Sequence, residues 1–138
     1  MAKFKTDALG NNAIVEESLV QTIIADTTLY NTDSGTNYLV GTDALVVSLS
    51  AAKDGVRLRV FNSGADGNNI VTISPIAGES IIGTISNAAA DSVSGGVAGK
   101  DIINTKATAN KGDYIDLLGV TSIGWYIDGG VGIWASEA

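Results

Sequence analysis

The chain has 138 residues, of which 45% are hydrophobic, and this share suits one globular domain with its own core and argues against wholesale disorder. It contains no Cys and no His, which excludes disulfides, thiolate chemistry and the commonest general base and metal ligand of proteins. Its net charge of −7, from 15 acids against 8 bases, opposes direct binding to the phosphates of a nucleic acid.

Residues 1–18 differ from the rest of the chain because they lack a regular apolar pattern and contain the turn-forming run Gly10-Asn11-Asn12. We interpret them as an extended N-terminal arm, followed by a single β domain over residues 19–138. The irregular spacing of the arm's apolar residues does not suit its own sheet, so we expect it to become ordered on a neighbouring subunit. A disordered terminus is the alternative. The candidate contact residues of the arm are Lys3, Phe4, Lys5, Leu9, Ile14 and Val15.

The start of the chain also bears on where the protein is made. Asp7, Asn11 and Asn12 interrupt any apolar core of a signal peptide, and no apolar run approaches the length needed to span a bilayer. We therefore expect synthesis in a cytoplasm and no contact with a membrane.

From residue 19 onward, short segments rich in Val, Ile and Thr alternate with turns rich in Gly, Asn and Asp. No segment keeps a helical period over three turns. The pattern predicts an all-β fold, an antiparallel β-sandwich or barrel of jelly-roll-like form. The predicted strands are residues 20–25, 38–40, 44–50, 56–61, 70–74, 80–85, 100–108, 113–118, 124–128 and 131–135.

The clearest local pattern covers residues 56–75. Val56, Leu58 and Val60 alternate with Arg57, Arg59 and Phe61, which indicates a strand with one buried face. Turn-forming residues fill positions 62–69, and a second β-branched strand follows at 70–74, ended by a proline. The two strands predict a β-hairpin with a long loop.

Residues 87–99 form the one low-complexity segment of the sequence. They include no aromatic residue and a single charge, Asp91. Because such a segment buries little area, we expect a loop at the edge of the domain.

Arg57 and Arg59 are the only arginines, and they lie two residues apart on one face of a predicted strand. One interpretation is a solvated strand face on which each arginine pairs with a nearby acid. The other is a protein–protein contact, because arginine is enriched at interfaces. Both residues are therefore candidate interface residues.

Catalytic and metal-binding constellations are sparse in this sequence. Asp113 and Asp116 are three residues apart on a strand, hence on opposite faces, which is a poor arrangement for paired-carboxylate hydrolysis. Residues 66–69 and 95–101 have a distant likeness to calcium-binding loops, but each fits ordinary turn chemistry. We expect no enzymatic activity, no catalytic residue, no metal and no cofactor.

Aromatic residues gather late in the chain. Trp125 and Tyr126 are adjacent, so on a strand one faces the core and the other faces the opposite surface. We expect Trp125 and Trp134 to fill the core. The alternative is an exposed platform on which a sugar stacks.

The succession of these motifs resembles small β-rich structural proteins of tailed bacteriophages, and among them the capsid decoration, or cement, proteins. The resemblance spans residues 38–135 as a general pattern. It rests on Gly-Val-Arg-Leu-Arg-Val-Phe-Asn (55–62), Asn-Ile-Val-Thr-Ile-Ser-Pro (69–75), Gly-Glu-Ser-Ile-Ile-Gly (78–83), Lys-Gly-Asp-Tyr-Ile (111–115) and Gly-Trp-Tyr-Ile (124–127).

The resemblance implies a structural role. Such proteins sit on the outside of the mature phage head as trimers and reinforce it, and they often use an N-terminal arm to clasp a neighbour. The expected partners are the major capsid protein and further copies of this chain, with no direct contact to nucleic acid. The expected location is the outer capsid surface of the virion. A phage fibre or spike domain, or a glycan-binding β module, is the alternative function.

Overall fold

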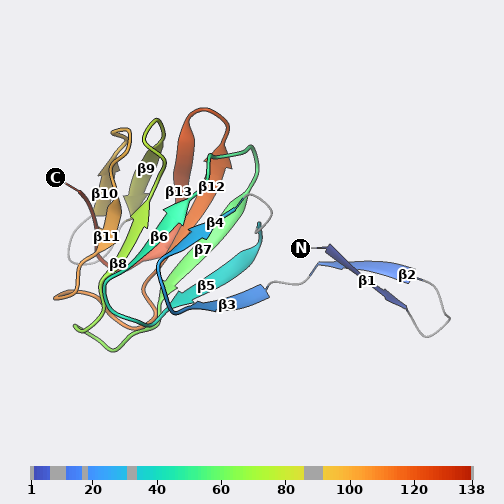
Figure 1. Ribbon diagram of the computed structural model, residues 1–138, viewed down its shortest axis with the longest axis horizontal. Coiled ribbons are helices and arrows are strands. Elements are labelled where there is room, and N and C mark those ends of the chain that lie inside the picture. Colours follow the sequence, from blue (N-terminus) through green and yellow to red (C-terminus); the bar gives the residue numbers. More distant parts are fainter. Residues whose placement is uncertain (1, 7–11, 17–18, 31–33, 86–91, 138) are drawn as a thin grey trace.

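The computed structural model describes residues 2–6, 12–16, 19–30, 34–85 and 92–137, and over these residues the chain forms strands and turns without a helix (Figure 1). Consequently no described helix is long and apolar enough to cross a membrane. The strands are β1 (Ala2–Thr6), β2 (Asn12–Glu16), β3 (Leu19–Ile23), β4 (Thr27–Leu29), β5 (Thr36–Val40), β6 (Leu45–Leu49), β7 (Arg57–Asn62), β8 (Val71–Ser74), β9 (Ser80–Ile85), β10 (Ser92–Gly95), β11 (Ile102–Asn104), β12 (Tyr114–Val120), β13 (Gly124–Val131) and β14 (Trp134–Ser136).

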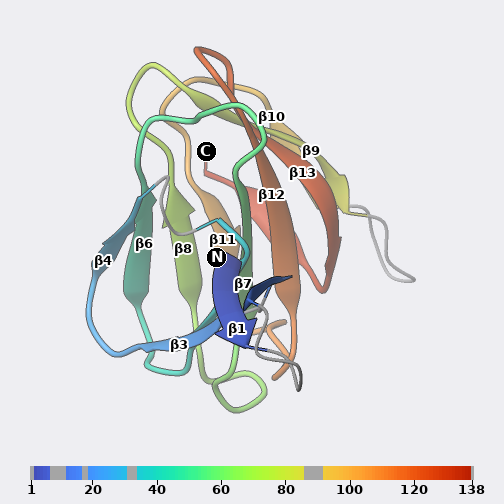
Figure 2. The ribbon, with the colours of Figure 1, turned by 90° about the vertical axis from the view of Figure 1, so that its right-hand side faces the viewer.

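Two sheets face each other and enclose one core. The larger has seven strands in the order β10-β9-β13-β12-β7-β5-β3, and the smaller has five in the order β14-β11-β8-β6-β4. Figure 2 shows β4, β6, β8 and β11 on one side, facing β12, β13 and β9 on the other. The predicted β-sandwich is confirmed.

Strands β3 to β8 alternate between the two sheets. β3, β5 and β7 lie parallel in the seven-stranded sheet, and β4, β6 and β8 lie parallel in the five-stranded sheet. Between two neighbouring strands of one sheet, the chain crosses to the opposite sheet and back. Each strand therefore runs parallel to the strand before it in the same sheet. The pairs that involve β9 to β14 are antiparallel, except β9 with β13. The sheets are thus mixed, which corrects the expected antiparallel, jelly-roll-like arrangement.

The hairpin predicted over residues 56–75 is wrong. β7 belongs to the seven-stranded sheet and β8 to the five-stranded sheet, so residues 63–70 carry the chain across the sandwich as an arch. Both strands do show the predicted alternation of buried and less buried residues. That alternation reports one buried face, and a strand in either sheet of a sandwich satisfies it equally well.

The core lies between the inner faces of the two sheets. Val60 of β7 and Ile73 of β8 are both fully buried there, from opposite sheets. Trp125 and Trp134 are 0% and 1% exposed, which confirms their predicted place in the core. Tyr126 is 39% exposed, as expected for the neighbour of a buried residue on a strand.

Several segments differ from the strand prediction. β4 lies in a polar region that was expected to be turns, and its pairing with β6 compensates for its weak pattern. β10 lies in the low-complexity segment that was expected to be a loop, where it pairs antiparallel with β9. In the predicted strand at 100–108, only the three residues of β11 are extended, and Thr105 to Ala109 form a turn closed by backbone hydrogen bonds.

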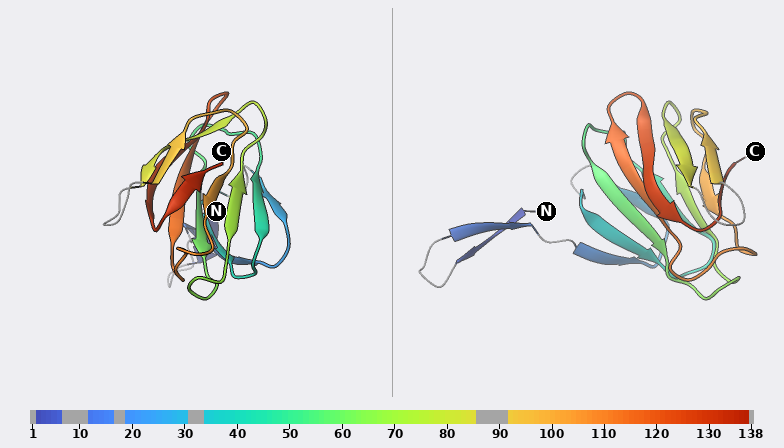
Figure 3. Two further views of the ribbon diagram at one scale, coloured as in Figure 1. Left: turned by 90° about the vertical axis from the view of Figure 1, so that its left-hand side faces the viewer. Right: turned by 180° about the vertical axis from the view of Figure 1, so that it is seen from behind.

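The described part of the N-terminal arm is a hairpin and not a single extended segment. β1 and β2 pair antiparallel as a two-stranded sheet of their own, drawn beside the larger sheets in Figures 1 and 3. Phe4 pairs with Ile14, and Lys3 pairs with Val15. The run Gly10-Asn11, which favours turns, was the signal in the sequence for this hairpin.

Candidate interaction face

The arginines of β7 lie on the outer face of the seven-stranded sheet. Leu58 and Val60 point into the core, so the alternate residues Arg57, Arg59 and Phe61 point outward. β12 lies antiparallel to β7. Its outward residues pair with those of β7, Asp116 opposite Arg59 and Tyr114 opposite Phe61. We call the set Arg57, Arg59, Phe61, Tyr114 and Asp116 the arginine–aromatic face.

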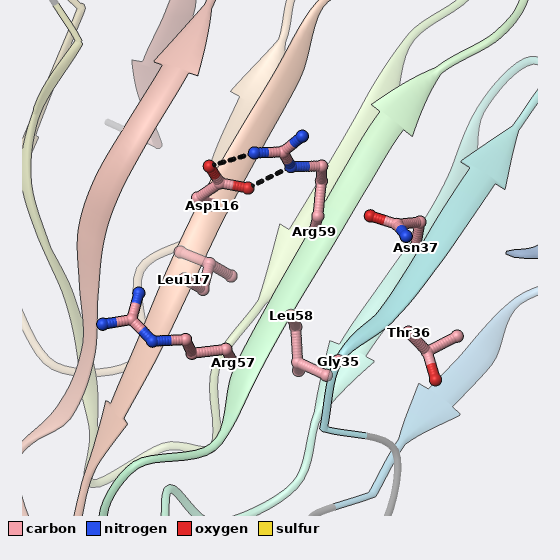
Figure 4. Close-up of a pocket in the computed structure, with 8 residues that line it drawn as sticks. All are labelled: Gly35, Thr36, Asn37, Arg57, Leu58, Arg59, Asp116 and Leu117. Atoms are coloured by element: carbon pink, nitrogen blue, oxygen red, sulfur yellow. Dashed lines mark hydrogen bonds and ion pairs between the residues drawn. The ribbon is translucent and has the colours of Figure 1, made fainter. Parts of the chain in front are cut away.

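A two-pronged ion pair holds Arg59 in place. Its Nε donates to Oδ1 of Asp116 at 2.5 Å, and its Nη2 donates to Oδ2 at 2.7 Å (Figure 4). This fork geometry fixes the plane of the guanidinium as well as its position. The hydrogen bond to Asp116 raises the pKa of Arg59 further above its already high usual value, so the side chain stays charged.

Two aromatic rings support the same guanidinium. The Cζ atom of Arg59 lies 4.6 Å from the centre of the Tyr114 ring and 5.7 Å from that of Phe61. The two rings contact each other, with centres 5.2 Å apart and planes tilted by 45°. Cation–π attraction and ring packing therefore orient Arg59 before any partner arrives.

Arg57 completes the charged part of the face. Its Nη1 donates to Oδ2 of Asp128, on β13 beyond β12. Arg57 is more exposed than Arg59, with 59% of its side chain accessible against 40%. Both arginines are thus paired with acids, as the solvated-face interpretation expected, and the face has little net charge in spite of the overall charge of −7.

A hollow of about 380 Å³ opens beside Arg59, between β5, β7 and β12 (Figure 4). Asn37 of β5 lies across from Arg59 in the parallel pairing and forms one wall. The hollow is lined by Gly35, Thr36, Asn37, Arg57, Leu58, Arg59, Asp116 and Leu117. These residues supply amide, hydroxyl and guanidinium groups, which suits the binding of a polar side chain from a partner.

Exposed apolar side chains border the face on both sides. Val131 pairs with Tyr114 and is 50% exposed, and Val20 pairs with Asn37 and is 67% exposed. Tyr126 lies on the same outer face next to Leu118. A rigid arginine on aromatic rings with apolar neighbours has the composition of a protein-binding surface.

The described residues show where the carboxylates considered for metal binding and catalysis lie. No group of three His, Cys, Asp or Glu side chains in the described ranges is placed to hold a metal ion. In the loop at 66–69, Oδ1 of Asp66 accepts a hydrogen bond from the backbone N–H of Lys111 at 2.7 Å. The side-chain Nδ2 of the buried Asn69 donates to the backbone oxygen of Val40 and to Oδ1 of Asn62. Asp113 is buried and Asp116 faces outward, so they lie on opposite faces as expected.

The structure unites only some of the predicted contact residues. Arg57 and Arg59 lie together on the arginine–aromatic face. Lys3, Phe4 and Lys5 belong to β1, whereas Ile14 and Val15 belong to β2. The predicted contact residue Leu9 lies outside the described residues.

Sequence reasoning missed three residues of the face, Phe61, Tyr114 and Asp116. Phe61 follows Arg59 in the same strand phase, and this alternation was the available signal. Tyr114 and Asp116 share a phase on their own strand, but only the pairing of β12 with β7 brings them to Arg59.

Comparison with known proteins adds no family to this description. No protein-family model matches the chain, and no curated protein is significantly similar to it in sequence.

Proposed function

We propose that this chain is a structural protein of a phage virion that decorates and stabilises the outside of the head. In this proposal it assembles as a homotrimer, bridges subunits of the major capsid protein, and is made in the host cytoplasm before it joins the virion. The role is mechanical and needs no reaction, because stability comes from contact area summed over many copies.

The observation that best supports this proposal is the fixed orientation of the Arg59 side chain. Binding hot spots are enriched in arginine and tyrosine, and affinity improves when their side chains are fixed before association. Arg59 is held by Asp116, Tyr114 and Phe61 within a face that has little net charge. Such a face can approach a partner without the repulsion that the remaining acidic surface would cause.

The core position of both tryptophans bears on the alternative function. A glycan-binding module of the kind considered above would present Trp125 or Trp134 to the sugar, and both are buried. The capsid-binding proposal places no demand on these residues.

Binding to isolated phage heads tests the proposal. Undecorated heads are mixed with purified full-length protein, and the bound fraction is measured by co-sedimentation and by imaging of the particles. We expect saturable binding in clusters of three. Arg59→Ala should weaken binding roughly tenfold or more, as at a hot spot, with a smaller loss for the more exposed Arg57→Ala.

A matched control is Lys106→Ala. It also removes a base that forms a surface ion pair, with Asp43, but it lies away from the arginine–aromatic face. Its binding should stay within about twofold of the unmodified protein, as for an exposed ion pair outside a contact. Well-separated single copies, or full binding by Arg59→Ala, would contradict the proposal, as would binding to tail fibres instead of heads.

A further inference from the structure

One end of the sandwich is open. Among the described strands, β3 and β4 are edge strands of the two sheets, and each pairs there with a neighbour on one side only. They are consecutive in the chain and form the first turn of the winding, so both edges end at the same side of the molecule (Figure 1). At the other end, the edge strands β10 and β14 contact each other. Unpaired strand edges present backbone donors and acceptors that can bind a further strand.

Several side chains on and next to β3 and β4 are exposed as well. Gln21 on β3 has the same phase as the buried Ile23, so it points toward the interior, yet it is exposed. Its partner on β5, Tyr38, is 1% exposed. The apolar residues Val20, Ile24 and Tyr30 are 67%, 79% and 61% exposed. Ile23 of β3 and Leu29 of β4 close the core at this end, so the exposed side chains and the free strand edges lie outside it.

The N-terminal hairpin is a suitable cover for this edge, because β2 and β3 have five residues each. A two-stranded hairpin is marginally stable by itself and gains stability when it joins a larger sheet.

The same hairpin is poorly suited to cover its own β3. Only Glu17 and Ser18 separate β2 from β3. A two-residue turn between antiparallel strands requires positive φ at one or both positions and therefore favours Gly, Asn or Asp. Glu and Ser do not meet this requirement.

We propose that the β1–β2 hairpin of one copy adds to the β3 edge of a second copy, so that the seven-stranded sheet continues across the subunit boundary. Donation from each copy to the next is a heterologous contact, and it closes into a ring when the rotation is 120°. This inference rests on the self-association in the proposed function, but it does not depend on attachment to a capsid.

Disulfide trapping in the full-length chain tests this proposal, because the sequence has no Cys of its own. Ile14 and Gln21 are the central residues of β2 and β3, so they lie opposite each other in either strand direction if the two strands pair in full. The variant Ile14→Cys/Gln21→Cys is oxidised and separated by electrophoresis without reductant. We expect most of the protein to migrate as covalent dimers and trimers. The control Ile14→Cys/Ile123→Cys places the second thiol at an exposed residue in the β12–β13 turn, and it should remain monomeric.

Two further variants report the strand direction, and they keep the test decisive if the first variant does not fold. Ala13→Cys/Thr22→Cys should cross-link if the strands are antiparallel, and Val15→Cys/Thr22→Cys if they are parallel. Circular dichroism and thermal melting identify which variants are folded. An intrachain disulfide in a monomer would place the hairpin on its own β3 and overturn the inference, and so would the absence of cross-links in all three folded variants. Heads are not needed, so failure here is distinct from failure of capsid binding.

Discussion

Asn62 and Asn69 bind each other across the arch that carries the chain from one sheet to the other. Nδ2 of Asn62 donates to the backbone oxygen of Asn69 at 3.0 Å, and Nδ2 of Asn69 donates to Oδ1 of Asn62 at 2.8 Å. Asn62 Nδ2 also donates to Oδ1 of Asn104, whose own amide donates to Asp113. All four side chains are buried, so this polar network determines how the arch closes.

We predict that Asn62→Ala lowers the free energy of unfolding by about 1–3 kcal/mol. The substitution removes the donor to Oδ1 of Asn104 and one of the two acceptors of the Asn69 amide, and the buried polar groups that lose a hydrogen bond then cost desolvation free energy. Urea unfolding followed by fluorescence measures the change. Asn68→Ala in the same loop is the control, because Asn68 is exposed and should change stability little. Equal stability of the two variants would contradict the role of the network.

Gly64 permits the close packing of the same arch. A Cβ atom at this position would lie 2.4 Å from Cβ of Asn69, well inside the contact distance. Gly64→Ala should therefore destabilise the fold by about 1–3 kcal/mol, as overpacking does in a core. Gly78→Ala is the matched control, because the added methyl group there meets no atom within 4 Å. The prediction fails if thermal melting shifts both variants equally.

Trp125 tests whether the late aromatic cluster serves stability or ligand binding. It is fully buried, so Trp125→Ala should cost about 3–5 kcal/mol in the free energy of unfolding. Tyr126→Ala, at the adjacent exposed position, should cost much less. Differential scanning calorimetry compares the two. A Trp125→Ala protein of unchanged melting temperature would refute the core assignment.

The pKa of Asp43 is lowered from its ordinary value of 3.8. The main cause is a hydrogen bond from the ammonium group of Lys106, and the backbone N–H of Ile70 adds another. A lowered folded-state pKa means that the charged carboxylate stabilises the fold above pH 3.8 and that this contribution is lost as the pH falls through the lowered pKa.

Removing the ammonium group should therefore raise the pKa of Asp43 toward its ordinary value. We expect this rise in Lys106→Met, measured by NMR titration of the carboxyl carbon. Lys111→Met is the control, since Lys111 contacts Asp66 through its backbone N–H. A lowered pKa that persists in Lys106→Met would assign the effect to Ile70 instead.

Several features of this protein followed from the sequence by itself. The alternation around Leu58 and Val60 correctly placed these residues inside and Arg57 and Arg59 outside. The density of short β-branched segments predicted an all-β sandwich, and the tendency of tryptophan to fill a β core predicted the burial of Trp125. These are local properties, because side chains on a strand alternate between two faces whatever the strand pairs with.

The tertiary structure alone decided which sheet each strand joins. Inner strands of both sheets contact the same core and carry the same pattern, so β7 and β8 looked like a hairpin although they lie in opposite sheets. The partners of Arg59 were hidden for a related reason. Asp116 is 57 residues away in the chain, and only the register between β7 and β12 brings it within hydrogen-bonding distance. Pairing between distant strands depends on the total area that the fold buries, and no single segment of sequence contains that information.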